Sequence, residues 1–255
     1  MSVRAPTLAA DAAALPPEGA RSALGRPGGG ATLGVVMLET RFPRPLGDIG
    51  NPRTFDFPVR YRVVRGASPR RVVVAGDRAL LAPFVDAARA LEEDGACAIA
   101  TSCGFLALFQ REMAAALATP LWTSSLLQVA EIEAALAGGA RCGVITVDAA
   151  SLGEAHLRAA GAAADTPIEG LAIDSRFRAT LLDDEEMLDE DEARRATVAA
   201  AERLLARRPE VRAIVLECTN MPPYADAVRA ATGLPVHDIT TLVRSRLGRM
   251  TKGAA

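Results

Sequence analysis

The sequence predicts an α/β protein made of two related halves, each built around a parallel sheet. Half of the 255 residues are hydrophobic, which is enough to bury a large core. From Leu33 onward, short runs rich in β-branched residues alternate with stretches rich in Ala, Leu, Glu and Arg at helical period. That alternation is typical of strands covered on both faces by helices. The third observation is that the two halves of the chain repeat each other.

The expected elements follow this alternation in chain order. The expected strands are short apolar runs: Leu33–Leu38, Arg71–Ala75, Cys97–Thr101, Pro120–Thr123, Gly143–Val147, Ala213–Glu217 and Leu234–His237. The expected helices are longer stretches of helical period: Ala79–Asp94, Phe105–Leu117, Ser125–Ala137, Leu152–Ala160, Glu192–Arg207 and Tyr224–Ala231. Most strands are therefore followed by a helix, which is the connection that a parallel sheet requires.

The two halves match at three places in the same order. The matching segments are Gly34–Glu39 with Gly143–Asp148, Ala98–Cys103 with Ala213–Cys218, and Pro120–Trp122 with Pro235–His237. Ordered matches of this kind indicate an internal duplication. We therefore expect an N-terminal extension over residues 1–31, a first α/β domain over 32–124 plus 239–255, and a second over 125–238.

Charge and composition exclude several classes of function. The formal net charge is −2 and the pI is about 5.8, so no overall field would attract nucleic acid or an anionic membrane. Residues 1–31 have no apolar segment after a basic start, and the longest charge-free stretch, 113–130, contains Pro120 and several polar residues. Four cysteines without a CxxC pair indicate reduced thiols and a cytoplasmic protein. The oligomeric state, a homo-oligomer included, stays open.

Two of the cysteines occupy equivalent positions in the repeat. Cys103 and Cys218 each follow an expected strand and precede an expected helix, at the sheet edge where α/β proteins carry function. Two halves facing each other would place both thiols across one cleft. The helix N-termini are expected to lower the pKa of each thiol and to bind a carboxylate. The expected anion-binding donors are the small polar neighbours Thr101, Ser102, Thr219 and Asn220.

Two thiols on opposite faces of a small anion suit stereo-inversion at a carbon that bears an acidic hydrogen. One thiolate removes the proton and the opposite thiol delivers another. Fixed donors can hold the enolate-like charge, so neither an organic cofactor nor a metal is expected. The sequence thus predicts a cofactor-independent racemase or epimerase that acts on a small carboxylate, such as an amino acid.

The segments around both cysteines resemble the aspartate/glutamate racemase family, which also includes hydantoin racemases, arylmalonate decarboxylases and maleate cis-trans isomerases. These segments are Ala100–Phe105 and Leu216–Tyr224, and a looser similarity runs over residues 33–243, including Gly47–Pro52. The resemblance implies two pseudo-symmetric Rossmann-like domains with parallel sheets, an active site in the cleft between them, and Cys103 and Cys218 as the acid/base pair. Decarboxylases of the superfamily keep one of the two cysteines, so the pair favours racemisation or isomerisation.

The sequence departs from typical glutamate racemases in two places. Asn220 stands where those enzymes carry His, and Glu39–Pro45 replaces their glycine loop, so glutamate is not the expected substrate. The loop over 39–58 is long for a strand–helix connection. The residues expected to bind substrate in addition to the four donors are Arg44, Asn51 and Gly104. An arginine in this loop would bind the substrate carboxylate through two parallel hydrogen bonds. A surface loop at the domain interface or a subunit contact is an equal alternative for this segment.

Two other functions stay open on the sequence alone. A cis-trans isomerase of an unsaturated diacid would add one thiolate to the double bond and permit rotation. A non-catalytic ligand-binding protein could use the same cleft.

The remaining polar and sulfur-containing residues are interpreted as structural. Cys97 and Cys142 lie at strand starts and are expected in the core. His156 is expected to face solvent or to be satisfied locally, and His237 to stand near the cleft as a supporting group. The acidic run over residues 183–192 predicts a solvated loop and the start of a helix, not a metal site.

Overall fold

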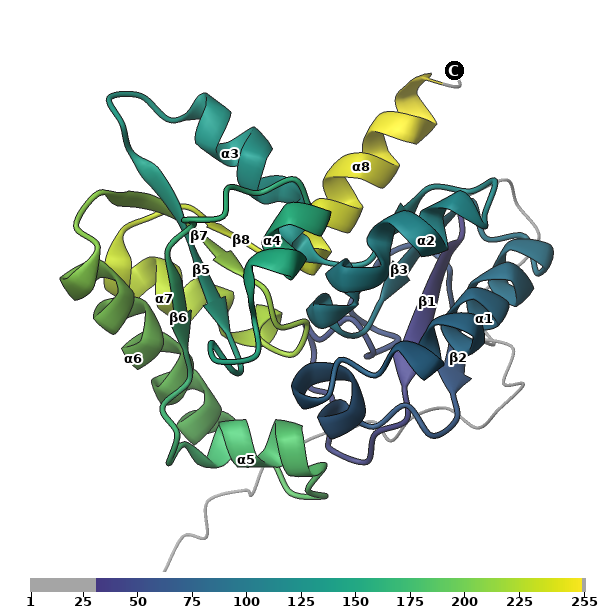
Figure 1. The fold of residues 1–255 in the computed structure, drawn as a ribbon, viewed down its shortest axis with the longest axis horizontal. Helices are drawn as coiled ribbons and strands as arrows, with labels where there is room; N and C mark the ends of the chain where they lie inside the picture. Colours follow the sequence, from purple (N-terminus) through teal and green to yellow (C-terminus); the bar gives the residue numbers. More distant parts are fainter. Residues whose placement is uncertain (1–30, 254–255) are drawn as a thin grey trace, which may run out of the picture.

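Two four-stranded parallel sheets form the framework of the protein (Figure 1). The computed structural model describes residues 31–253, so the extension predicted over residues 1–31 lies outside the described part except for its last residue. The first sheet contains β1 (Leu33–Leu38), β2 (Val59–Val64), β3 (Ala98–Thr101) and β4 (Leu121–Trp122). The second contains β5 (Arg141–Thr146), β6 (Ile168–Gly170), β7 (Val211–Leu216) and β8 (Val236–His237).

The strand order confirms the two pseudo-symmetric Rossmann-like halves. The first sheet runs β2-β1-β3-β4 and the second β6-β5-β7-β8, so each strand has a counterpart at the same place in the other sheet. All of these pairings are parallel. Equivalent strands therefore end at equivalent edges, and the loops that follow them occupy equivalent positions.

Helices cover the sheets and complete the two lobes seen in Figure 1. They are α1 (Leu81–Glu93), α2 (Gln110–Ala115), α3 (Val129–Ala135), α4 (Glu154–Ala159), α5 (Arg176–Asp183), α6 (Glu190–Arg207), α7 (Ala225–Thr232) and α8 (Ile239–Gly253). Shorter helical turns precede several of them: η1 (Arg70–Val74), η2 (Arg78–Leu80), η3 (Gly104–Phe109), η4 (Ser125–Gln128) and η5 (Pro222–Tyr224). No helix within residues 31–253 is long and apolar enough to cross a membrane.

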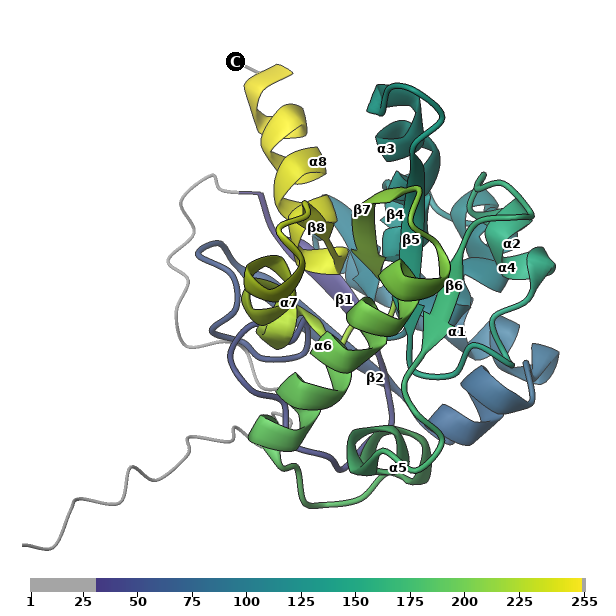
Figure 2. The same ribbon diagram turned by 90° about the vertical axis from the view of Figure 1, so that its left-hand side faces the viewer.

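Strand β1 is buried on both faces, as the apolar run predicts. Val36 and Leu38 join the larger apolar core, while Leu33, Val35 and Met37 join a smaller one on the other face. That smaller core is completed by the apolar side of α8, through Ile239, Leu242, Val243 and Leu247. Helix α8 follows β8 of the second sheet but packs on the first. It stands between the two lobes in Figure 1, and in Figure 2 its C-terminal end projects from the body of the molecule. We propose on this basis that the chain divides into 32–124 plus 239–253 and 125–238.

One expected strand is wrong. Residues Arg71–Val74 belong to η1, a single π-helical turn, and Ala75 is its C-cap residue, so no strand forms here. The run of three valines has the β-branched composition of a strand, but only Val72 and Val73 are buried and Val74 is half exposed. The turn packs against α5 and η3 of the surrounding structure, so tertiary contacts outweigh local propensity here.

Four elements were not expected from the apolar pattern. Strand β2 alternates buried and exposed residues, with arginines on its open side, which is typical of an edge strand. Strand β6 has only three residues. Helix α5 begins at Ser175, whose hydroxyl accepts a hydrogen bond from the backbone N–H of Arg178. Helix α8 follows Asp238, whose carboxylate accepts from the backbone N–H groups of Thr240 and Thr241.

Candidate active site

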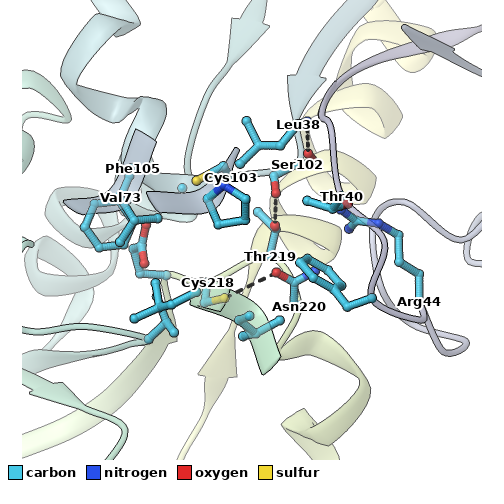
Figure 3. Close-up of a pocket in the computed structure, with 17 residues that line it drawn as sticks. Leu38, Thr40, Arg44, Val73, Ser102, Cys103, Phe105, Cys218, Thr219 and Asn220 are labelled. Atoms are coloured by element: carbon cyan, nitrogen blue, oxygen red, sulfur yellow. Dashed lines mark hydrogen bonds between the residues drawn. The ribbon is translucent and has the colours of Figure 1, made fainter. Parts of the chain in front are cut away.

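The structure brings Cys103 and Cys218 to the wall of one cavity (Figure 3). Cys103 follows β3 and is the N-cap residue of η3, with extended backbone at φ −150° and ψ 117°. Cys218 follows β7 after one intervening residue and precedes η5. Because β3 and β7 are counterparts in the two sheets, the loops after them meet across the domain interface. The fold thus accounts for the pairing of two thiols 115 positions apart in the chain.

Burial controls the protonation state of both thiols. Removal from water raises the pKa of Cys103 to about 12, and the nearby Glu217 carboxyl adds to this effect. The backbone N–H groups of Phe105 and Leu106 act in the opposite direction but are outweighed. Burial and Glu217 also raise the pKa of Cys218 well above its ordinary value. The backbone N–H groups therefore act in the expected direction, but the expectation of low thiol pKa values is wrong because burial outweighs them.

The cavity is narrow and largely apolar. Its apolar walls come from the first loop, η1, η3 and α5, through Phe42, Val73, Phe105, Leu181 and Leu182. The volume is about 30 Å³, which is close to the space of a single water molecule. A substrate with several carbon atoms needs more room. The cavity must therefore widen to admit such a substrate.

Arg44 is held by its own loop. Its Nη1 donates to Asp48 Oδ1 at 2.9 Å and its Nη2 donates to Thr40 Oγ1 at 2.9 Å. Asn51 does not line the cavity, because its Nδ2 donates to the Arg44 carbonyl at 2.8 Å and so supports the loop. Arg44 does line the cavity, yet only its Nε lacks a hydrogen-bond partner among the described residues. A bidentate fork from Arg44 to a substrate carboxylate therefore requires that Asp48 or Thr40 first be released.

The polar residues beside the cysteines hold the two loops together. Thr101 does not line the cavity, and its hydroxyl group donates to the Thr123 carbonyl at 2.7 Å, with the Cys103 carbonyl 3.1 Å from the same oxygen. Ser102 and Thr219 do line the cavity, and Thr219 Oγ1 donates to the Ser102 carbonyl across the domain interface at 2.6 Å. The Cys218 thiol donates a hydrogen bond to Asn220 Oδ1 at 3.6 Å.

A further bond ties Asn220 to the Arg44 loop. Its Nδ2 donates to Asp48 Oδ2 at 2.7 Å, across the interface between the halves. This contact fixes the amide so that its oxygen faces the Cys218 thiol. Cys218 is therefore held as a hydrogen-bond donor, which favours its protonated form.

Glu217 is a cavity residue that sequence reasoning did not select. It is fully buried, it lines the cavity, and its Oε2 accepts a hydrogen bond from Thr146 Oγ1 at 2.7 Å. Burial raises its pKa to about 8. The signal available in the sequence was an acidic residue at the end of an otherwise apolar strand, directly before Cys218.

Gly104 has a structural reason to lack a side chain. A Cβ at this position would overlap Oε1 and the backbone oxygen of Glu217, and would lie 2.8 Å from the Glu217 Cδ. The absence of a side chain at Gly104 thus lets the Glu217 carboxyl group approach the turn that carries Cys103.

Ion pairs connect the acidic run to the other half of the protein. Arg41 Nε lies 3.2 Å from Asp184 Oδ2 and its Nη1 lies 2.9 Å from Glu186 Oε1. Arg70 Nε donates to Asp183 Oδ1 at 2.9 Å. Part of the run therefore contacts the first half, while its later residues begin α6 with Asp189 as N-cap, as expected. These pairs join the end of α5 and the segment after it to the loops that line the cavity.

We expect these ion pairs to hold the cavity closed. Each exposed pair is worth about 0.2–1 kcal/mol, so replacing Arg41 and Arg70 together with alanine, which removes three such pairs, should increase opening at least about 3-fold. The measurement is the rate at which iodoacetamide alkylates Cys103 and Cys218, followed by peptide mass spectrometry. Raising NaCl from about 0.05 to about 0.5 M should speed alkylation of the wild type more than that of the variant.

Arg78→Ala is the matched control, because Arg78 pairs with Glu112 inside the first half and both side chains are exposed. Its alkylation rate should equal that of the wild type. Equal rates for the double variant and the wild type would show that these pairs do not gate the cavity.

The other predicted residues lie outside the cavity lining. Cys142 is buried as expected, but Cys97 is only half-buried, with its thiol donating to the Thr32 carbonyl. His156 does not face solvent: it is buried with its ring edge-on to Phe105. His237 is half-buried. All four cysteines are free, and residues 31–253 contain no cluster of three or more potential metal ligands.

Comparison with known proteins identifies a family model and two relatives that this chain is similar to. A model of the Asp/Glu/hydantoin racemase family matches residues 73–244. A dimethylsulfoniopropionate lyase from Durusdinium sp. clade D is 32% identical over 225 residues, which cover 82% of this chain and 71% of that lyase. Dimethylsulfoniopropionate lyase 6 from Emiliania huxleyi is 33% identical over 231 residues, which cover 86% of this chain and 60% of that lyase. The chain thus spans less than two thirds of the second relative.

Solved structures share the architecture at lower sequence identity. Unliganded arylmalonate decarboxylase has a TM-score of 0.57 at 18% identity, covering 86% of this chain and 91% of that one. Allantoin racemase from Pseudomonas fluorescens has a TM-score of 0.50 at 16% identity, covering 88% and 92%. These likenesses show the two-domain fold.

Proposed function

The chain belongs to the Asp/Glu/hydantoin racemase family, and from that premise we propose that it is a lyase that eliminates a sulfonium group from dimethylsulfoniopropionate. The observation that carries the proposal is the pair of cysteines in one mainly apolar cavity. A cysteine there can remove the proton next to a carboxylate, which is the step that racemisation and this elimination share. The relatives of similar sequence that are named as dimethylsulfoniopropionate lyases favour elimination.

The elimination balances with a single base. The thiolate takes the proton from the carbon next to the carboxylate, and an S–H bond forms. The electrons of that C–H bond form the C=C bond of acrylate, while the bond between carbon and the sulfonium sulfur breaks with its electron pair going to sulfur. The products are acrylate, neutral dimethyl sulfide and the proton held by the cysteine, which returns to solvent. A neutral leaving group needs no acid to protonate it.

Cys103 is the cysteine that we assign as the base. The N–H groups of Phe105 and Leu106 favour its thiolate, whereas Cys218 has one such group, from Asn220. The Cys218 thiol is engaged as a donor to Asn220 Oδ1. Cys103 therefore loses its proton more readily, and the positive charge of a bound sulfonium would favour the thiolate further.

Headspace gas chromatography tests the elimination directly. Purified protein incubated with dimethylsulfoniopropionate is expected to release dimethyl sulfide and acrylate in equal amounts. No release above the rate of a Cys103→Ser, Cys218→Ser double variant would exclude this activity.

Racemisation or epimerisation of a small carboxylate is the second candidate. The observation that favours it is the presence of two cysteines, from equivalent loops, in the same cavity. In D₂O, a racemase would introduce deuterium at the carbon next to the carboxylate of amino acids or hydantoins. Absence of deuterium in every such compound, together with release of dimethyl sulfide, would decide for elimination.

A further inference from the structure

The buried Glu217 carboxyl group lies between the two catalytic loops. It directly precedes Cys218 in the chain, and it packs on Gly104, the residue after Cys103. Its backbone N–H donates to the Ile145 carbonyl of β5, so the main chain is fixed by the second sheet. The carboxyl group is thus held in place at the point where both cysteines meet the cavity.

This carboxyl group is only half satisfied. Thr146 donates to Oε2, but Oε1 has no hydrogen-bond partner among the described residues. Arg44 is the one basic side chain among the residues that line the cavity, and it is paired with Asp48. A buried, unpaired carboxylate is strongly disfavoured, so the group keeps a proton until a positive charge replaces it.

We propose that Glu217 is the counter-charge for a cationic group of the substrate, of the methylated sulfonium or quaternary ammonium class. The inference rests on the proposed function, in which the substrate carries both a cation and a carboxylate. In Figure 3, Cys103 and Cys218 lie between Arg44 on one side and Phe105 and Val73 on the other. The Phe105 ring offers a face for the cation, and Val73 and Val147 contact its methyl groups.

The arrangement assigns the two ends of the substrate. The cation lies at Glu217 and the carboxylate lies toward Arg44, so the two carbons between them, including the one that loses its proton, stand at the cysteines. An ionised Glu217 beside the cation also explains how a buried negative charge and a thiolate can exist together in one apolar cavity. An ionised Glu217 without a cation beside it would raise the pKa of both thiols.

Cation binding should release a proton from Glu217. The charged and titratable groups that face this part of the cavity are Cys103, Cys218, Arg44 and Asp48, and Thr146 is its hydrogen-bond donor. Burial places the pKa of Glu217 near 8, so at pH 7 the group is mostly protonated when the cavity is empty. A bound cation lowers this pKa and drives off the proton.

The test uses two unreactive ligands of the same shape. 3-(Trimethylammonio)propionate carries the positive charge, and 4,4-dimethylpentanoate replaces its nitrogen with carbon. By isothermal titration calorimetry the wild type is expected to bind the charged ligand at least about tenfold more tightly. Glu217→Gln should abolish that preference. Glu133→Gln, which changes a glutamate paired with Arg141 outside the cavity, should keep it.

The number of protons released on binding is a second measurement. It would not change if Glu217 had only a structural role. Titrations at pH 7 in two buffers of different ionisation enthalpy should show release of nearly one proton by the wild type and none by Glu217→Gln. Equal binding of the two ligands by the wild type, or a preference that survives in Glu217→Gln, would overturn the proposal.

These outcomes also separate this inference from the proposed function. Charge preference without release of dimethyl sulfide would keep Glu217 as a cation site and remove the lyase activity. Release of dimethyl sulfide that is unchanged in Glu217→Gln would keep the lyase activity and remove Glu217 as a cation site. If Glu217→Gln does not fold, the wild-type preference and proton release still decide.

Discussion

Replacing Cys103 with serine is expected to lower kcat for elimination about 10³-fold. A serine hydroxyl is a much weaker acid than a thiol, so it cannot carry the negative charge that removes the proton. The initial rate of dimethyl sulfide release at saturating substrate measures the change.

In the wild type, kcat/KM should rise with pH through the neutral range, because burial raises the pKa of the free Cys103 thiol to about 12 and the base must be deprotonated.

Cys218→Ser distinguishes the two candidate reactions. Elimination needs one base, so this variant should lose only about tenfold in kcat. Racemisation needs both thiols, so each variant would lose activity to a similar extent. Cys97→Ser is the control, since Cys97 lies outside the cavity lining. If Cys103→Ser keeps its activity and Cys218→Ser loses it, the assignment of the base is reversed; two active single variants would exclude a thiol base.

Replacing Asp48 with alanine is expected to lower the free energy of unfolding by about 3–5 kcal/mol. Arg44 and Asp48 are 2% and 1% exposed, and their ion pair is 2.9 Å long. Removal of Asp48 leaves the Arg44 charge buried without its partner, and also releases the Gly50 N–H and the Asn220 amide. Urea denaturation at constant pH measures the loss.

Asp56→Ala is the matched control for this substitution. Asp56 also pairs with an arginine, Arg244, but its side chain is 83% exposed, so the expected change is within about 0.5 kcal/mol. Replacing both Arg44 and Asp48 with apolar residues of similar volume should restore much of the stability lost in Asp48→Ala. A loss below about 1 kcal/mol for Asp48→Ala would show that Arg44 reaches water or another partner when Asp48 is absent.

The duplicated framework was predictable from the sequence, because buried parallel strands carry a strong local signal. The apolar runs of β1, β3, β5 and β7 are mostly buried on both faces, which is typical of strands in a parallel sheet. Their repeated order predicted two equivalent sheets. The weaker elements were missed where that signal is absent. The edge strand β2 carries arginines, β6 is three residues long, and the valine run at η1 has the composition of a strand but takes its conformation from packing against α5 and η3.

The pairing of Cys103 with Cys218 also followed from the sequence alone. Their equivalent places in the repeat put both after counterpart strands, and parallel topology brings such loops to one edge. Their residue type and position relative to a strand end are local properties. The reaction class that uses two such groups could therefore be narrowed before any coordinates were known.

Only the tertiary structure decided the electrostatics of the site. Whether Arg44 is free or paired with Asp48, and whether the thiols are exposed or buried, depends on which residues from distant loops surround them. The same holds for Glu217, whose role arises from its packing on Gly104 and from the lack of a cation beside Oε1 among the described residues. Sequence patterns report local conformation and burial periodicity, whereas pKa values and charge pairing are set by neighbours that the chain brings together only when folded.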